Sequence, residues 1–134
     1  NMSIQRQAAE VDRVKRSESG MIQDPVTIAP EQTLREAVAS MERTGINGLP
    51  VVRRDGALVG ILTSRDLRFE TDLDRLVGDV MTREGLVTAP VGTSLTEAER
   101  ILHRHRIEKL PVVDAEGRLA GLITFKDIVK RRQY

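Results

Sequence analysis

The sequence has 134 residues, 40% of them hydrophobic, which is enough to build the core of a compact domain. Its net charge of +1, from 21 basic and 20 acidic residues, excludes a general electrostatic attraction to nucleic acid or to an anionic membrane. Two phenylalanines and one tyrosine offer few rings for stacking bases, and the absence of cysteine excludes disulfides, thiolate metal sites and a cysteine nucleophile.

The first predicted element is a helix at residues 3–16, where apolar residues recur at helical spacing between charged ones. Its apolar stripe consists of Ile4, Ala8, Val11 and Val14. A short strand is expected around residues 26–28. Thr33 and Glu36 then have the spacing of a capping box, in which a hydroxyl and a carboxylate satisfy amides left unpaired at a helix start. The helix that begins there should bury a face made of Leu34, Ala37, Val38 and Met41.

Two further strands are predicted at residues 49–52 and 58–62, with Asp55 and Gly56 as turn residues between them. An apolar run, a turn and a second apolar run are typical of a β-hairpin. Thr63 then marks the start of a closing helix. The predicted order of elements in this part of the chain is therefore β-α-β-β-α.

The same order returns later in the chain, because residues 26–67 align with residues 87–128 without a gap. The stretch GILTSRD at residues 60–66 returns as GLITFKD at residues 121–127. The second copy should contain a strand around 86–88, a helix opened by the capping-box pattern of Ser94 and Glu97, and strands at 110–113 and 119–123. Its helix should bury Leu95, Ala98, Ile101 and Leu102, and the segment VGDVMT at 77–82 should be a helical lead-in. The chain is a tandem duplication.

The order LPVV…DG…GILTSRD followed by LPVV…EG…GLITFKD resembles a pair of CBS motifs, the tandem called a Bateman module. The resemblance covers residues 20–130. It implies an α/β (α+β) fold of two β-α-β-β-α repeats packed with pseudo-twofold symmetry. Such modules bind adenosine or guanosine nucleotides in clefts between the repeats, and they regulate an attached enzyme or transporter.

The flanking segments 1–11, 15–21 and 121–132 look like those of bacterial inosine-5′-monophosphate (IMP) dehydrogenase, in which a Bateman module is inserted into a loop of a (β/α)8 barrel. The barrel chemistry of that family uses NAD, a cysteine nucleophile and a glycine-rich phosphate loop. Because neither the cysteine nor that loop is present, we expect a regulatory segment without dehydrogenase activity of its own. On this reading the chain comprises a leading helix and linker from the barrel (1–19), a first repeat (20–69), a connector (70–85), a second repeat (86–130) and an exit toward the barrel (131–134).

The resemblance also implies ligands and partners. The expected effector is a purine nucleotide, namely ATP, GTP or a dinucleotide polyphosphate together with Mg²⁺, with no covalently bound cofactor. The expected protein partners are the catalytic barrel and further copies of the chain, as a module dimer within a parent tetramer or octamer. Neither an apolar run long enough to span a bilayer nor a signal-peptide pattern occurs, so we expect a cytoplasmic protein without a membrane partner.

The repeated motif can be interpreted in two ways. Thr63 lies where a strand becomes a helix, so its hydroxyl and the next free amides suit a phosphate. Asp66 lies one turn into the helix, and the resemblance assigns to it, and to Asp127, the binding of two ribose hydroxyls. Thr-x-x-Asp is equally a capping box that needs no ligand, and duplication copies a cap as faithfully as a binding site.

The resemblance extends the candidate site to the segments around the motif. GINGLP and RIEKLP, before the central strands, would wall the base, although their apolar residues could equally be ordinary core. The candidate ribose ligands are Asp66 and Asp127. The candidate phosphate ligands are Thr63, Ser64, Arg65, Arg68, Thr124, Lys126 and Lys130. The candidate base contacts are Val26, Thr27, Ile46, Leu49, Val87, Thr88, Ile107 and Leu110.

Four functions are compatible with the sequence to different degrees. The leading hypothesis is a purine-nucleotide sensor, and the alternative is an oligomerisation module that binds no nucleotide. Nucleic-acid binding through the basic segment 126–132 is disfavoured by the low net charge. Catalysis is least favoured, because no nucleophile–base pair or metal cluster stands out. His103 and His105 are two positions apart and do not share a helical face, so we interpret them as surface or interface histidines.

Overall fold

The computed structural model describes residues 21–126 and residue 128, and they form two compact units. The first-repeat unit contains residues 26–86 and 116–118. The second-repeat unit contains residues 21–25, 87–115 and the described residues from 119 onward. Residues 21–25 therefore group with the second repeat, although they precede the first one in the chain.

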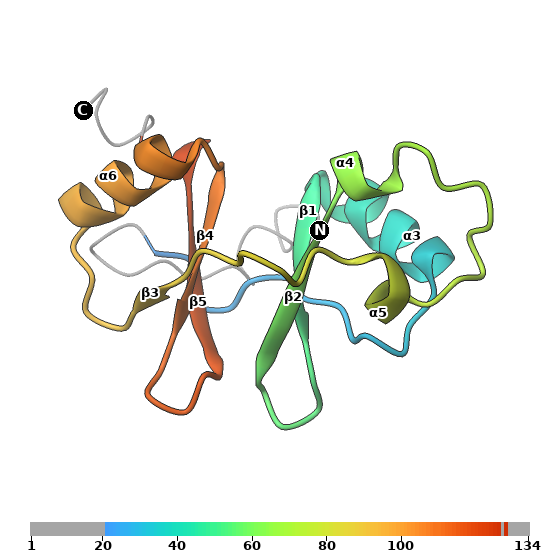
Figure 1. The fold of residues 1–134 in the computed structure, drawn as a ribbon, viewed down its shortest axis with the longest axis horizontal. Helices are drawn as coiled ribbons and strands as arrows, with labels where there is room; N and C mark the ends of the chain where they lie inside the picture. Colours follow the sequence, from blue (N-terminus) through green and yellow to red (C-terminus); the bar gives the residue numbers. More distant parts are fainter. Residues whose placement is uncertain (1–20, 127, 129–134) are drawn as a thin grey trace, which may run out of the picture. The chain divides into compact units, whose positions relative to one another are not determined.

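The first-repeat unit is built on the antiparallel hairpin of β1 (Gly48–Val52) and β2 (Leu58–Thr63). Ile28 forms a parallel bridge with Val51, at the free edge of β1. The helix α3 (Leu34–Thr44) lies beside this hairpin, and the short helices α4 (Ser64–Leu67) and α5 (Val77–Val80) follow β2 (Figure 1). The predicted hairpin, first helix and helical lead-in are confirmed, whereas the predicted first strand is reduced to a single bridge.

The second-repeat unit has the same order of elements. Its sheet contains β3 (Ala89–Pro90), parallel to β4 (Lys109–Val113), which is antiparallel to β5 (Leu119–Thr124). The helix α6 (Leu95–His105) connects β3 to β4, and Phe125, Lys126 and Ile128 are helical after β5. The strand predicted around residues 86–88 was placed too early, because the parallel pairing begins at Ala89.

The two long helices begin at the predicted caps, but only the first is a complete capping box. The Thr33 amide donates to Glu36 Oε1 at 2.8 Å, and the Glu36 amide donates to Thr33 Oγ1 at 3.2 Å. In α6 the Glu97 amide donates to Ser94 Oγ at 3.1 Å, but the Glu97 carboxylate accepts from Arg100 instead of closing the box. The second predicted box is therefore half formed, because an arginine one turn along competes for the carboxylate.

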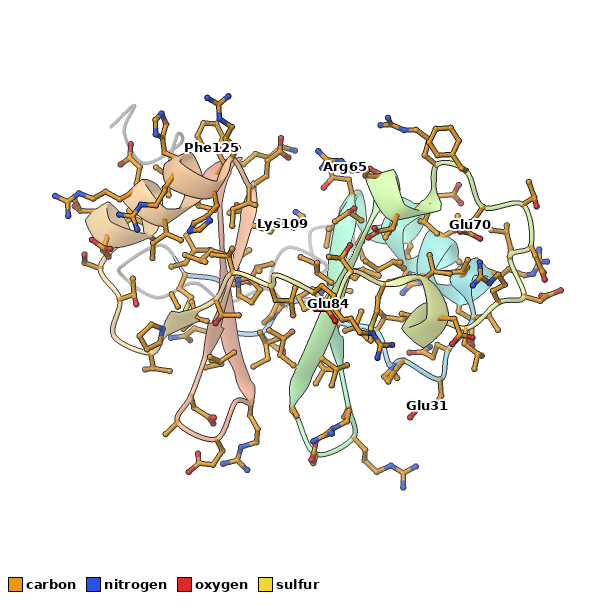
Figure 2. The ribbon with its side chains drawn as sticks, viewed as in Figure 1. Glu31, Arg65, Glu70, Glu84, Lys109 and Phe125 are labelled. Atoms are coloured by element: carbon orange, nitrogen blue, oxygen red, sulfur yellow. The ribbon has the colours of Figure 1, made fainter. Side chains whose placement is uncertain are left out.

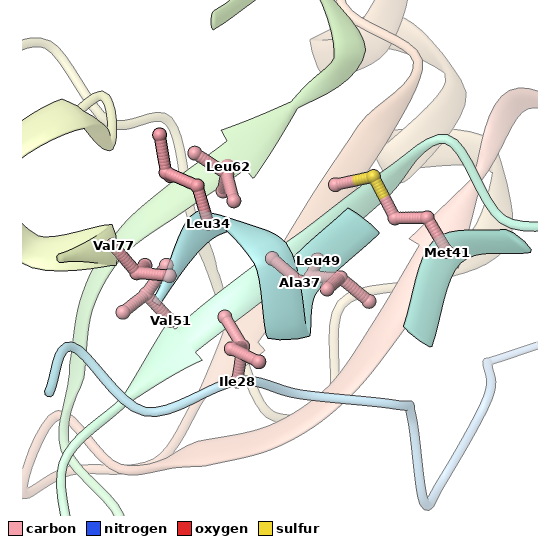
Figure 3. Packing of buried hydrophobic residues seen from close by; sticks show 8 residues of the cluster. All are labelled: Ile28, Leu34, Ala37, Met41, Leu49, Val51, Leu62 and Val77. Atoms are coloured by element: carbon pink, nitrogen blue, oxygen red, sulfur yellow. The ribbon is translucent and has the colours of Figure 1, made fainter. Parts of the chain in front are cut away.

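Each unit has its own apolar core, to which the predicted helix faces contribute, although Val38, Leu95 and Ile101 of those faces are only half-buried. In the first-repeat unit Leu34, Ala37 and Met41 of α3 pack with Leu49, Val51 and Leu62 of the hairpin (Figure 3). In the second-repeat unit Ala98 and Leu102 of α6 take the same part against Leu110, Val112 and Ile123. The α/β fold expected for two β-α-β-β-α repeats is confirmed.

A two-residue segment covers the outer edge of each hairpin. Ile61 and Thr82 exchange two backbone hydrogen bonds of 2.9 Å, and Met81 lies over Gly60. In the second-repeat unit Ile22 and Leu122 exchange bonds of 2.8 and 2.9 Å, and Met21 lies over Gly121. The groups that approach Gly60 closely are therefore the Met81 side chain and the Thr82 carbonyl.

We expect Gly60→Ala to destabilise the fold by about 1–3 kcal/mol, the usual cost of overpacking. A Cβ there would lie 2.5 Å from Met81 Sδ and 2.9 Å from the Thr82 carbonyl oxygen. Urea unfolding monitored by circular dichroism measures this loss. Adding Met81→Ala should recover only part of it, because the carbonyl stays in place. Unchanged stability of Gly60→Ala would contradict the packing described here.

The remaining expectations about architecture lie outside the described residues or stay predictions. The leading helix at 3–16, with its stripe Ile4, Ala8, Val11 and Val14, lies outside the described residues. The pseudo-twofold packing of the repeats and the domain boundaries stay predictions. Among the described helices, none is long and apolar enough to cross a membrane.

Candidate functional site

Three segments that are distant in the sequence meet at one end of the first-repeat sheet. The parallel bridge of Ile28 with Val51 directs residues 26–27 along the start of β1, and the hairpin register places Thr63 opposite Gly48. The Ser64 amide donates to the Asn47 carbonyl at 3.0 Å, so the loop before β1 touches the start of α4. This end of the sheet lies opposite the hairpin turn, and Arg65 projects from it (Figures 1 and 2). The segments predicted to contact base, ribose and phosphate therefore share one end of the sheet.

The second-repeat unit repeats this arrangement. Ala89 pairs with Val112, so residues 87–88 run toward the start of β4, where Lys109 lies opposite Thr124. The Phe125 amide donates to the Glu108 carbonyl at 2.8 Å, as Ser64 does to Asn47. Lys109 and Phe125 mark this end of the unit in Figure 2. The same arrangement of three segments therefore occurs in both repeats.

Asp66 is half-buried and already accepts three hydrogen bonds. The Thr63 amide donates to Oδ2 at 3.0 Å, and the Thr63 hydroxyl lies 3.3 Å from the same oxygen. The Thr82 hydroxyl donates to Oδ1 at 2.9 Å. In return, the Asp66 amide donates to Thr63 Oγ1 at 3.4 Å, which completes a capping box. The capping interpretation of Thr-x-x-Asp is confirmed in the first repeat, and the ribose role stays a prediction.

The candidate phosphate ligands differ in their availability. The Thr63 hydroxyl accepts from the Asp66 amide, and the Ser64 amide is used by Asn47, so the free amide expected directly after Thr63 is occupied. The helix α4 has only four residues, which leaves little macrodipole to attract an anion. Arg65 and Arg68 are exposed, as is the Ser64 side chain. At this end of the unit, the charged side chains are therefore better placed to bind a phosphate than the start of helix α4.

The candidate base contacts divide into buried and accessible residues. Leu49 and Leu110 are 0% exposed and belong to the two cores, so their side chains support the core interpretation. The half-buried candidates are Val26, Ile46, Val87 and Ile107, and the exposed ones are Thr27 and Thr88. The accessible residues are the ones that stay candidates for touching a base.

The two ends are not chemically equivalent, as the divergence of GING and RIEK suggests. Gly45 ends α3 in the left-handed region with φ 71°, and its counterpart Arg106 adopts φ 55° at the end of α6. Ser64 is replaced by Phe125, whose side chain is 46% exposed. In the second repeat Thr124 is half-buried and Lys126 is exposed, while the candidates Asp127 and Lys130 lie outside the described residues.

Sequence reasoning missed Thr82, which binds Asp66 from the connector. The signal was available, because Met81-Thr82 and Met21-Ile22 both place a methionine before the residue that pairs with a hairpin. It was overlooked because these segments lie outside the gapless alignment of the repeats. The histidines His103 and His105 are exposed on α6, as expected.

Comparison with protein-family models matches the CBS domain at residues 12–71 and again at residues 77–134. The chain belongs to the CBS-domain family. Its two units are therefore a tandem of CBS repeats, each with a Thr-x-x-Asp motif at the end of its hairpin. The resemblance on which the sequence interpretation relied is confirmed.

Individual relatives connect this CBS pair with purine enzymes. The IMP dehydrogenase of Halalkalibacterium halodurans is 58% identical over 97% of this chain, which covers 27% of that relative. The chain thus spans about a quarter of the length of the curated relatives it matches. A GMP reductase structure from Trypanosoma brucei is 32% identical with a TM-score of 0.79, covering 98% of this chain and 30% of that one. The structure of CBSX2 in complex with AMP is 28% identical with a TM-score of 0.73, covering 84% of this chain and 90% of that one.

Proposed function

We propose that this CBS pair is the nucleotide-sensing module of an IMP dehydrogenase in guanine nucleotide biosynthesis. In this role it binds a purine nucleotide and thereby changes the activity or the oligomeric state of the parent enzyme. The observation that carries the proposal is the convergence of three segments at one end of each repeat, on a chain this similar to IMP dehydrogenases. The AMP in the related CBSX2 structure supports an adenosine-type ligand.

In the first repeat, the proposed roles follow from what each residue can offer. Asp66 is the ribose ligand, because a carboxylate can accept from both hydroxyls of a diol. Arg65 and Arg68 are exposed cations that can form charge-assisted bonds to phosphate. Ile46 and Val26 present apolar surface to the base, with Thr27 beside them.

In the second repeat, the same roles fall to the aligned residues. Asp127 is the proposed ribose ligand, and Lys126 and Lys130 are proposed phosphate partners. Ile107, Val87 and Thr88 are proposed at the base. Within the described part of the chain no group of three or more acidic residues or histidines could hold a metal, so Mg²⁺ is proposed to bind through the phosphates of the nucleotide. The dehydrogenase reaction and its NAD belong, in this proposal, to the barrel of the parent.

A specific observation favours the alternative, an oligomerisation module without a nucleotide. The Asp66 carboxylate is engaged by Thr63 and Thr82, so the motif has a structural use that requires no ligand. Such a module would act through contacts with the barrel or with further copies of itself.

Isothermal titration calorimetry with MgATP and MgGTP separates the two functions. The proposal predicts saturable heat with a dissociation constant below about 1 mM, the range in which cellular nucleotides would regulate the module. A ligand shifts an equilibrium only through different affinities for its two states, so binding is the necessary first result. Silence with both nucleotides at millimolar concentration would favour the oligomerisation module.

A further inference from the structure

The contact of interest is the hydrogen bond between the connector and the motif aspartate. Thr82 Oγ1 lies 2.9 Å from Asp66 Oδ1 and is 16 positions away in the chain. The backbone of Thr82 is fixed independently by its two hydrogen bonds with Ile61. The hydroxyl is therefore held beside the carboxylate by the sheet edge and not by the motif itself.

The Thr82 hydroxyl uses one of the hydrogen-bond acceptor positions of the Asp66 carboxylate, and these positions can be counted. A carboxylate offers about four acceptor positions. The Thr63 amide and hydroxyl both donate to Oδ2, and the amide bond together with the bond from the Asp66 amide to Thr63 Oγ1 forms the capping box of α4. Oδ1 is the oxygen that the cap leaves for a ligand, and Thr82 takes one of its two positions. Three donors leave one of the four positions open, so a ribose diol that binds with both hydroxyls needs a second position, and on Oδ1 the Thr82 hydroxyl holds it.

We propose that Thr82 is an internal competitor of the nucleotide at the first repeat, weakening ribose binding to Asp66. This inference rests on the proposed function. Cap formation does not require Thr82, because Thr63 alone supplies both bonds of the box. Removing the hydroxyl should therefore free an acceptor without releasing the carboxylate from its position.

The position of Thr82 carries no hydroxyl in the second-repeat unit. Ile22 holds the place of Thr82 in the second-repeat unit, with the same pair of backbone bonds, here to Leu122. Met21 lies over Gly121 as Met81 lies over Gly60. An isoleucine side chain has no hydroxyl to donate, so this position cannot supply the same competitor in the second repeat.

Calorimetry with MgATP on the chain and its Thr82 variants tests this inference. Thr82→Val keeps the β-branched shape and the backbone bridge but removes the donor. It should raise affinity at the Asp66 site about two- to tenfold, as expected for the net contribution of one hydrogen bond. Thr82→Ser restores a hydroxyl and should return the affinity to that of the unaltered chain. Ile22→Val is the matched control at the equivalent position, and it should change nothing.

The outcomes separate this inference from the proposed function. If the unaltered chain binds nucleotide and Thr82→Val binds it equally or more weakly, the competitor role is overturned and the proposed function stands. Tighter binding by Thr82→Val that Asp66→Asn does not abolish also overturns it, because the effect would not pass through the carboxylate. If neither the unaltered chain nor any variant binds, the proposed function fails and this inference fails with it.

Discussion

Asp66→Asn should lower the affinity of the first repeat for nucleotide about ten- to a hundredfold while leaving the fold intact. A hydrogen bond to a charged group is worth about 1.5–3 kcal/mol, which corresponds to that loss of affinity. Asparagine keeps an oxygen that can accept from the Thr63 amide, so the cap of α4 survives. Its amide can donate to the Thr82 hydroxyl, which reverses the direction of that bond without breaking the contact.

Calorimetry measures the expected loss of nucleotide affinity, and thermal melting measures whether the fold keeps its stability. The melting temperature should stay within a few degrees of the unaltered chain. Glu36→Gln is the matched control, because Glu36 closes the equivalent capping box of α3 and has no proposed ligand. Asp127→Asn repeats the test at the second copy. Equal losses of melting temperature in Asp66→Asn and Glu36→Gln, with affinity untouched, would reduce the motif to a folding element.

Leu49→Ala should cost about 2–5 kcal/mol of unfolding free energy, the usual range for truncating a fully buried leucine. Leu49 is fully buried in the first core, between α3 and the hairpin (Figure 3). The loss combines reduced apolar burial with the cavity left behind, and equilibrium unfolding in urea measures it. Leu76→Ala is the control, because Leu76 is 42% exposed and should lose far less. A drop in nucleotide affinity without loss of stability would instead place Leu49 in the ligand site.

Much of each unit was predictable because its signals are local. Short sequence patterns indicated the local conformation: a helix start at Thr33, a turn at Asp55-Gly56 and strands in the apolar runs on either side of that turn. Structure confirms the turn chemistry, since Asp55 accepts from the Ala57 amide at 3.0 Å and from Arg53 at 3.1 Å. These two bonds, the amide first, hold the pKa of Asp55 below its ordinary value.

Features that depend on competition between groups were not predictable. Ser94 and Glu97 have the spacing of a capping box, but the pattern cannot say that Arg100 draws the carboxylate away. The short parallel strand β3 has two residues, too few for any periodicity. An apolar run in the sequence does not show whether Leu49 faces a base or the core. Its packing with the residues of α3 in the core decides this.

The candidate site was predicted as a set of segments but not as a set of available groups. The resemblance implied that the GINGLP segment and the motif contribute to one pocket, and the structure brings Asn47 and Ser64 into contact at the end of the first hairpin, while nucleotide binding there stays a prediction. It did not reveal that the Ser64 amide is already bonded or that Thr82 reaches Asp66 from the connector. Both are contacts between segments distant in the sequence, and they modify a site whose location was predicted from local motifs.

A crystal structure of the chain grown with MgATP and MgGTP would show directly whether a nucleotide binds at Asp66. We expect ribose hydroxyls within hydrogen-bond distance of the Asp66 carboxylate, with the Thr82 hydroxyl turned away from Oδ1 and the Thr63 cap retained. The Arg65 side chain should approach the phosphates. A nucleotide bound elsewhere, with the Thr82–Asp66 bond still in place, would contradict this expectation.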